Sequence, residues 1–529
     1  MRLRRSRLLA ATGLAVLLAA GAVPGAGAAE PSPPPEPWPL LTEADVQKAL
    51  DRLDGYVADT MRSTGIPGMS VAVVYRDKVV YLKGFGVRKA GEPAKVGPDT
   101  VFQLASVSKP LSSTVVAGAV ADGGVRWGDP VAKHLPGFTL KDPWVGEHVT
   151  VADLFSHRSG LPDHAGDLLE DLGYDQQYIL QHLKYEALDP FRTSYAYTNF
   201  GLTAAAEAVA AAKGVTWQKL SEDVLFRPAG MTATSTTFED YAKAADRAYG
   251  HVRTADGSWQ AREVRDADAQ APAGGASSTA EDMAKWLRLQ LAAGKLGGKQ
   301  VVDGEELLHT HQPQITSSPS RTPVARTGFY GFGWNVSYDD QGRLRLSHTG
   351  AFDLGANTNV TMLPAEELGI VVLTNAAPTG VPDAVALDFF DTAQYGKPRT
   401  DWLALAASLY TQQLSLGDEP SPTNYASPPA DAKAAQDDAA YLGTYENEFY
   451  GRLEVVEGAD GGLVLLLGPE PERYPLTHYD GNTFSFLTRG ENAVGRTGVT
   501  FKDGAVRVEY LDQTGLGTFT KAGGQPSAG

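Results

Sequence analysis

The 529-residue sequence contains no cysteine. This absence excludes disulfide bridges, thiolate metal sites and a cysteine nucleophile. Basic residues are also scarce, because 46 Lys and Arg stand against 63 Asp and Glu, for a net charge of −17 at pH 7. No run of Lys and Arg follows the first seven residues, so nucleic acids and anionic membrane surfaces are unfavourable partners.

Residues 1–29 have the order of an export signal. Four arginines within the first seven residues precede a short apolar stretch at 8–20, and small residues end the segment at Ala26-Gly27-Ala28. This order predicts a cleaved secretory signal, since Gly and Ala interrupt a run too short to span a bilayer. An uncleaved anchor is the alternative, and Arg4-Arg5 leaves both the general and the twin-arginine export route open. The mature protein is expected to be soluble, secreted or periplasmic, without an integral membrane segment.

Two proline-rich breaks divide the remaining chain. Residues 30–41 predict a spacer, and residues 415–437 place four prolines among Asp, Ser and Ala, which predicts a linker. A hydrophobic fraction of 43% with 21% charged residues is typical of a globular protein, and the length suits two or three folding units. We therefore expect a large domain over 42–414 and a small one over 438–523.

Strand patterns lie at both ends of the large domain. Residues 69–75 and 78–85 are β-rich and separated by Arg76-Asp77, which predicts an antiparallel hairpin, and residues 100–330 are Ala-rich and mostly helical. Because helices separate the strands at the two ends, we expect both ends to belong to one antiparallel sheet, which is an α+β fold. Later strands are predicted at 344–348, 357–362 and 368–373, and helix starts at Thr42-x-x-Asp45, Thr150-x-x-Asp153 and Ser278-x-x-Glu281.

The last 85 residues or so have a different pattern. From 443 to 521, short alternating segments are separated at regular spacing by turns that contain Gly or Asp. This spacing predicts a small antiparallel barrel or sandwich.

Ser106 and Lys109 form an S-x-x-K arrangement directly before an apolar helical pattern. If Ser106 opens that helix, Lys109 lies one turn along the same face and can accept the hydroxyl proton. The helix N-terminus also offers free N–H groups to an oxyanion. A helix cap beside a solvated lysine would give the same short pattern.

Two further segments add polar groups to this candidate site. Tyr197-Thr198-Asn199 places a phenol and a carboxamide two residues apart, where a loop that enters a helix can project both into one cleft. His348-Thr349-Gly350 ends a β-rich run, in which alternation points His348 and Gly350 to one face and the glycine would admit a substrate backbone. Taken singly, a core tyrosine, a turn asparagine and a strand histidine also explain these residues.

The ordered set S-x-x-K, Y-x-N and H-T-G resembles the serine β-lactamase and penicillin-binding-protein superfamily, in its branch of AmpC-type β-lactamases and DD-peptidases. The resemblance covers roughly residues 42–400 and implies an antiparallel sheet with flanking helices plus a mainly helical subdomain. Residues 438–523 look like the lipocalin-like β domain of such hydrolases, which can cover the cleft or make oligomer contacts. Supporting segments are G-I-P-G at 65–68, F-S-H-R-S-G-L-P at 155–162, Y-G-F-G-W at 330–334 and Y-L-G-T-Y at 441–445.

The resemblance implies an acyl-enzyme mechanism without cofactor or metal. Ser106 attacks an amide, ester or β-lactam carbonyl, Lys109 and Tyr197 share the removal of its proton, and Tyr197 protonates the leaving group. The backbone N–H groups of Ser106 and Ala351 would form the oxyanion hole. The substrate-binding residues that the family implies are Asn199, His348, Thr349, Gly350 and Ala351.

His348 stands where many β-lactamases carry lysine, and it resembles the H-T-G of some DD-peptidases and D-aminopeptidases. This departure argues against efficient β-lactam hydrolysis and makes a carboxylate-holding role for His348 depend on its charge. The expected substrate is a D-amino-acid-containing peptide, cleaved as by a DD-carboxypeptidase or D-aminopeptidase. An esterase or β-lactamase of the same fold, and a cell-wall receptor with poor turnover, stay open alternatives.

Two other hydrolase classes fit less well. An α/β-hydrolase needs G-x-S-x-G, whereas Gly68-Met69-Ser70-Val71-Ala72 ends in alanine. A metallohydrolase is unsupported because His309-x-His311 stands without H-E-x-x-H or a cysteine cluster. Cleft loops and the C-terminal domain set the specificity of such a fold, so the true substrate and the oligomeric state stay open.

Overall fold

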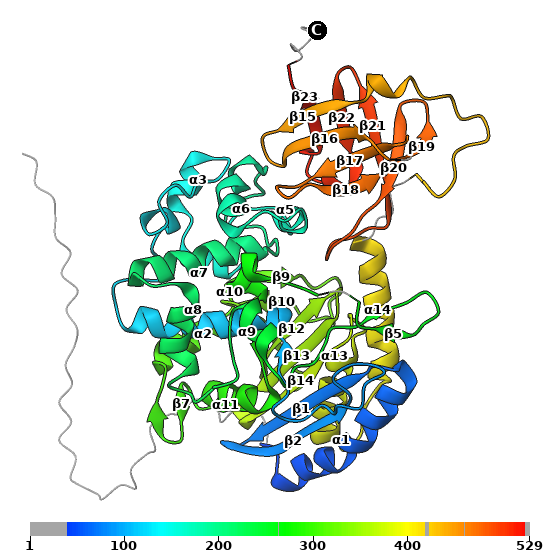
Figure 1. The fold of residues 1–529 in the computed structure, drawn as a ribbon. Coiled ribbons are helices and arrows are strands. Elements are labelled where there is room, and N and C mark those ends of the chain that lie inside the picture. Colours follow the sequence, from blue (N-terminus) through cyan, green and yellow to red (C-terminus); the bar gives the residue numbers. More distant parts are fainter. Residues whose placement is uncertain (1–39, 263, 418–422, 460, 524–529) are drawn as a thin grey trace, which may run out of the picture. The chain divides into compact units, whose positions relative to one another are not determined.

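Strand β1 (Gly68–Tyr75) lies inside an antiparallel sheet with helices on both faces (Figure 1). The computed structural model describes residues 40–262, 264–417, 423–459 and 461–523, so the predicted signal at 1–29 lies outside the described residues. Every residue of β1 is buried, which explains why it is mostly apolar on both faces. Among the described residues the sheet has the order β2 (Lys78–Gly86), β1, β14 (Leu368–Thr374), β13 (Ala356–Leu363), β12 (Leu344–Phe352), β11 (Asn335–Tyr338), β10 (Gly328–Tyr330) and β9 (Ile315–Ser318).

The two faces of β1 belong to two hydrophobic cores. Val71 and Val73 pack in the core that contains α1 (Glu43–Thr64) and α13 (Val381–Tyr395), whereas Ala72 and Val74 face the helical middle region. The alternation follows from the two-residue period of a strand. First and last segments of the large domain therefore share one sheet, and the predicted hairpin and α+β class are confirmed.

Side-chain caps set the starts of several helices. The helix starts predicted at Thr42 and Thr150 are confirmed, and these residues form capping boxes with Asp45 and Asp153. The cap of α11 (Ala280–Leu291) is Thr279, so the prediction of Ser278 is wrong by one residue, because Ser278 pairs in the short strand β6 (Ser277–Ser278). The other helices are α2 (Ser108–Ala121), α3 (Pro143–His148), α4 (Val151–Phe155), α5 (Asp167–Asp171), α6 (Gln176–His182), α7 (Asn199–Lys213), α8 (Trp217–Ser221), α9 (Phe238–Lys243), α10 (Ala271–Gly274), α12 (Gly304–Thr310) and α14 (Trp402–Gly417).

A second antiparallel sheet follows α14 in the chain. Among the described residues it holds nine strands and curls into a nearly closed barrel, in which contacts join β18 to β20 near the two ends of the strand order. The predicted small antiparallel barrel is thus confirmed. Its order is β18 (Glu472–Pro475), β17 (Leu463–Leu467), β16 (Gly451–Glu457), β15 (Gly443–Asn447), β23 (Thr518–Lys521), β22 (Ala505–Val508), β21 (Arg496–Lys502), β20 (Thr483–Leu487) and β19 (Thr477–Asp480).

The predicted linker at 415–437 begins inside a helix, because α14 continues to Gly417. The described residues from Leu40 onward form one compact unit, so the division into a large and a small domain stays a prediction. None of the helices in the described ranges combines the length and the apolar character that crossing a bilayer requires. Three two-stranded pairs complete the secondary structure: β3 (Phe102–Gln103) with β6, β4 (Val252–Arg253) with β5 (Trp259–Gln260), and β7 (Lys295–Leu296) with β8 (Lys299–Gln300).

Candidate active site

Ser106 lies in a short 3-10 turn, η1 (Ala105–Val107), that leads directly into α2. Ala105 is fully buried and has a φ of 47°, in the left-handed region that non-glycine residues adopt only when the surrounding structure enforces it. The hydroxyl of Thr358 donates to the carbonyl of Leu104 at 2.7 Å and holds the same turn. The turn that presents Ser106 is therefore strained and fixed from the neighbouring sheet.

Gly350 of β12 is the residue against which this turn packs. A Cβ at Gly350 would lie 2.1 Å from the carbonyl oxygen of Leu104 and 3.1 Å from the backbone nitrogen of Ser106. The glycine thus admits the chain's own turn at this position, where we had expected a substrate backbone. The close approach brings the strand and Ser106 to the same place.

Lys109 is fully buried one turn after Ser106. Its Nζ lies 3.0 Å from Ser106 Oγ, 2.7 Å from Asn199 Oδ1 and 3.1 Å from the carbonyl oxygen of Ala273. A neutral amine has two N–H groups and one lone pair. Asn199 Oδ1 and the Ala273 carbonyl can take both N–H groups, which leaves the lone pair for the hydroxyl proton of Ser106.

The pKa values of Lys109 and Tyr197 move in opposite directions for the same reason. Burial lowers the pKa of Lys109 to about 7, although the charge of Asp167 opposes the shift. Burial raises the pKa of Tyr197 well above its usual value of 10.0, and its hydroxyl donates to Ser106 Oγ at 2.7 Å. Near neutral pH the lysine can therefore lose its proton while the phenol keeps its own.

Asn199, the first residue of α7, is oriented by a carboxylate. Its Nδ2 donates to Asp167 Oδ2 at 2.9 Å, so its Oδ1 faces Lys109. Asp167 Oδ2 also lies 2.7 Å from His164 Nδ1, and although burial opposes it, this contact raises the pKa of His164 to about 8. The amide of Asn199 is thereby held between the amine of Lys109 and the carboxylate of Asp167.

His348 is buried and neutral. Its Nδ1 lies 2.9 Å from the carbonyl oxygen of Thr349, which can only accept, so Nδ1 carries the proton and Nε2 accepts from the Tyr330 hydroxyl at 2.9 Å. Burial, with a smaller effect from Lys109, lowers the pKa of His348 to about 3. The protonated form that a carboxylate-holding role requires is absent at neutral pH.

The predicted site residues meet at one cavity of about 760 Å³. Strand β12 loses its neighbour β11 after Ser347, and from His348 onward it pairs with β13 alone. Lys109 does not line the cavity but is buried in contact with Ser106 and Asn199, which do. Gly350 packs against the Ser106 turn. The predicted residues that line the cavity are Ser106, Tyr197, Asn199, His348, Thr349 and Ala351.

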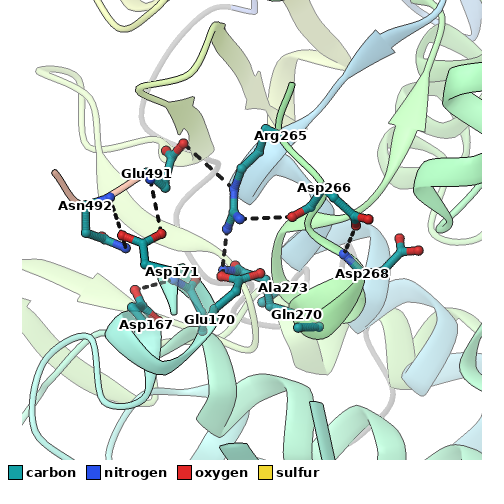
Figure 2. A network of polar contacts seen from close by, with 12 residues as sticks. Asp167, Glu170, Asp171, Arg265, Asp266, Asp268, Gln270, Ala273, Glu491 and Asn492 are labelled. Atoms are coloured by element: carbon teal, nitrogen blue, oxygen red, sulfur yellow. Dashed lines mark hydrogen bonds and ion pairs between the residues drawn. The ribbon is translucent and has the colours of Figure 1, made fainter. Parts of the chain in front are cut away.

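The C-terminal sheet contributes to the same cavity. Glu491 and Asn492, in the loop between β20 and β21, line it together with Ser106. Asp171 accepts from the backbone N–H of Glu491 at 3.1 Å and from that of Asn492 at 2.8 Å (Figure 2). The Glu491 carboxylate in turn accepts from the backbone N–H of Asp353 at 2.7 Å, directly after β12.

Arg265 lies between Glu170 of helix α5 and Glu491 of the loop between β20 and β21 (Figure 2). Its guanidinium is 2.6 Å from Glu170 Oε2 and 3.8 Å from Glu491 Oε2, and it donates to the carbonyl of Asp266 at 2.9 Å. Burial raises the pKa of Glu170 to about 7 and that of Glu491 to about 8, although Arg265 opposes both shifts. We call Glu170, Asp171, Arg265, Glu491 and Asn492 the docking network.

Several functional contacts were missed in the sequence. Tyr330 lies in the Y-G-F-G-W segment, which we had used only to support the resemblance. Asp167 is the first residue of α5 and Glu491 lies in the loop between β20 and β21, and their separation in sequence from the three motifs gives no sign of a shared site. Among the described residues, no group of three or more His, Cys, Asp or Glu side chains is arranged to hold a metal ion.

The fold that surrounds the Ser106 cavity is β-lactamase-like. Residues 53–390 match the family model described as Beta-lactamase, and the chain belongs to this family. Its fold is the expected β-lactamase/transpeptidase-like one, followed by the barrel-like sheet.

The relatives are distant. The chain is 28% identical over 349 residues to an unguisins hydrolase of Aspergillus campestris, a match that spans 62% of this chain and 62% of that protein. It is 23% identical over 335 residues to the D-alanyl-D-alanine-carboxypeptidase/endopeptidase AmpH of Escherichia coli, over 62% of this chain and 85% of AmpH. Penicillin-binding protein 4 of Amycolatopsis lactamdurans is 28% identical over 61% of this chain and 84% of its own length.

A solved structure covers more of the chain. The octameric penicillin-binding protein homologue from Pyrococcus abyssi aligns with a TM-score of 0.56 at 19% identity, over 87% of this chain and 98% of that one. At this identity the likeness shows the fold alone.

Proposed function

We propose that this chain is a serine hydrolase that forms an acyl-enzyme at Ser106. The observation that carries the proposal is the pair of contacts at Ser106 Oγ, with the Lys109 amine at 3.0 Å and the Tyr197 hydroxyl at 2.7 Å. A lysine with a pKa near neutrality is a general base, and a protonated phenol is a general acid.

The chemistry proceeds in two halves. Ser106 Oγ attacks the carbonyl carbon as its proton passes to Lys109 Nζ, and the negative charge on the carbonyl oxygen meets the backbone N–H groups of Ser106 and Ala351. Tyr197 donates its proton to the leaving nitrogen or oxygen as the bond to the carbonyl carbon breaks, and the proton on Lys109 replaces it. Water then attacks the acyl-enzyme with the same groups, which releases the acid and Ser106.

The proposed substrate is an amide or ester within a D-amino-acid-containing peptide. The name of the AmpH relative supports this class, as do the H-T-G motif and the cavity, which is large enough for a peptide segment. The neutral state of His348 removes one cation that a β-lactam carboxylate would need. An esterase or β-lactamase activity of the same site is the alternative.

We further propose that residues 1–29 direct export and that the domain at 438–523 is lipocalin-like and limits access to the cleft. Glu491 and Asn492 support the second point, because both line the cavity that contains Ser106.

The test is intact mass spectrometry during turnover of D-Ala-D-Ala peptides, D-amino-acid amides, nitrocefin, a fluorescent penicillin and p-nitrophenyl esters. We expect a Ser106 adduct that clears with product release from at least one amide or ester. An adduct that forms but persists with every compound favours a receptor. Failure of every compound, including a fluorophosphonate, to label Ser106 would overturn the proposal.

A further inference from the structure

Asp383 brings a carboxylate to the edge of the sheet beside the Ser106 cavity. It lies in the first turn of α13, is partly exposed, and lines the cavity together with Thr349 and Tyr410. The Thr349 hydroxyl donates to Asp383 Oδ1 at 2.6 Å, Asn359 Nδ2 donates to the same oxygen at 2.9 Å, and the Tyr410 hydroxyl donates to Oδ2 at 3.0 Å. The family resemblance did not single out Asp383.

In these contacts the hydroxyls of Thr349 and Tyr410 and the amide of Asn359 already donate to Asp383. A hydroxyl has one proton, and that of Thr349 points to Asp383, while its oxygen accepts from Asn359 Nδ2 at 3.2 Å. The single N–H of neutral His348 donates to the carbonyl of Thr349. A substrate group beside Thr349 therefore meets the oxygen atoms of Thr349 and Asp383, because these hydrogen bonds already occupy the protons of the adjacent donors.

The cations near the cavity are also occupied. Lys109 is surrounded by three acceptors, and Arg265 lies between Glu170 and Glu491. Among the described residues that line the cavity, His164 is the other side chain that can carry a positive charge near neutral pH, because its contact with Asp167 raises its pKa to about 8 against the effect of burial. The carboxyl groups of the lining are those of Asp163, Asp167, Asp383 and Glu491.

The charge of Asp383 depends on what lies beside it. Burial raises its pKa above the usual value, whereas its three hydrogen-bond donors and its position at a helix N-terminus favour the ionised form. An ammonium within contact distance favours that form further, and it supplies the donors that Thr349 and Asp383 lack. A carboxylate in the same place would face oxygen atoms and like charge.

We propose that Thr349 and Asp383 form a subsite that binds a protonated amine of the substrate and excludes a free carboxylate. This subsite rests on the proposed function, because the amine must lie close to the carbonyl that Ser106 attacks. Trp402, Leu405 and Leu409 of α14 line the same cavity and suit the carbon chain that carries the amine. The substrate class is thereby narrowed to amides or esters of D-residues with a free amine near the scissile bond.

The experiment compares matched substrates on the native protein. One series of D-amino-acid p-nitroanilides carries a free amine, an N-acetyl group or an N-succinyl carboxylate on the acyl side. A second series of D-residue peptides carries an ammonium, an amide or a carboxylate on the leaving group. We expect kcat/KM for the amine to exceed that of both isosteres by about tenfold or more in one series, as a charge-assisted hydrogen bond allows.

Asp383→Asn keeps the size of the side chain and removes the charge. It should reduce the amine preference by about tenfold or more, mainly through KM of the amine substrate. Asp388→Asn is the matched control, since Asp388 lies on the same helix, pairs with Arg52 and does not line the cavity. In that variant we expect the same preference as in the native protein.

Three results would overturn the subsite: equal treatment of amine and N-acetyl substrates in both series, a preference of the native protein for carboxylates, or a preference that survives Asp383→Asn. The comparison of amine, neutral and carboxylate substrates on the native protein tests the subsite even if the Asp383→Asn variant does not fold. Failure of the proposed function is distinct, because Ser106 would then form no adduct with either series or with a fluorophosphonate.

Discussion

Two buried cations flank the same cavity, and their partners give them opposite roles. Lys109 is surrounded by uncharged acceptors on Ser106, Asn199 and Ala273. Arg265 lies instead between the carboxylates of Glu170 and Glu491. Burial penalises the charge of both, but only Arg265 has acidic partners in direct contact that compensate.

As a consequence, Lys109 can act as a proton acceptor, whereas Arg265 stays charged and holds Glu170 and Glu491 together. The pKa of Lys109 falls to about 7, so the amine can exchange a proton with Ser106. The pKa of Arg265 rises above its usual value, because the charges of Glu170 and Glu491 outweigh burial. The same desolvation thus makes lysine reactive among neutral groups and leaves arginine as a structural cation among acids.

The largest expected effect on activity comes from substitution of Ser106 or of its neighbour Lys109. Ser106→Ala should abolish acyl labelling and lower kcat by about 10⁴-fold, and Lys109→Ala should be nearly as damaging because proton transfer fails. Ser113→Ala is the control, since Ser113 lies on the same helix and donates to the Pro110 carbonyl. Turnover by Ser106→Ala within tenfold of the native rate would refute the assignment of the nucleophile.

Tyr197→Phe removes one hydroxyl and should slow acylation by about 10²- to 10³-fold, as expected for loss of a general acid. The ring stays in place, so thermal unfolding should change little. Tyr241→Phe provides the comparison, because the Tyr241 hydroxyl is also buried and donates to the Ala248 carbonyl outside the cavity. Stopped-flow measurement of acylation separates this effect from deacylation, and a native acylation rate would argue against the role.

The pH profile tests whether Lys109 acts as the neutral amine. Since its pKa is about 7, kcat/KM should rise with pH through about 7 and then level off, falling about tenfold per pH unit on the acid side. The pKa of His348 is about 3, so profiles for neutral and carboxylate substrates should run parallel above about pH 5. An inflection confined to carboxylate substrates would restore the charge-dependent role predicted for His348.

Truncation after Leu416 removes the C-terminal sheet and with it Glu491, the partner of Arg265. We expect the shortened chain to keep labelling by a small fluorophosphonate, since the three motifs lie before this point. The ranking of long and short substrates should change several-fold, because Glu491 and Asn492 no longer line the cavity. Loss of all labelling in a folded truncated chain would show that the C-terminal sheet supplies an essential group, and an unchanged ranking would exclude a cap.

The smallest effect concerns the docking network. Glu170 and Glu491 have pKa values raised to about 7 and about 8, so the folded state binds their protons more tightly than the unfolded state. This contribution favours folding at acid pH and declines as pH rises to about 8. Glu491→Gln should therefore flatten the fall in Tm between about pH 5.5 and pH 8.5, by roughly 2 °C or more. Identical slopes in native and variant proteins would contradict this account.

The sequence by itself determined the features that depend on neighbours along the chain. The hairpin of β1 and β2, the capping boxes at Thr42 and Thr150 and the alternating strands of the C-terminal sheet follow from local periodicity and cap chemistry. The contact between Ser106 and Lys109 belongs here too, since one helical turn separates them. The cap of α11 was misplaced by one residue because pairing of Ser278 with Phe102 is not local.

Tertiary structure alone decided the chemistry of the cavity. Asp383 and Glu491 reach it from positions far apart in the chain, and none of the three motifs indicates them. Burial by residues distant in sequence lowers the pKa of Lys109 and keeps His348 neutral, and Asp383 accepts the hydrogen bond that the Thr349 hydroxyl donates. Desolvation and hydrogen-bond partners are properties of the packed chain, so the reactive amine and the charge of the subsite arise only when these segments meet.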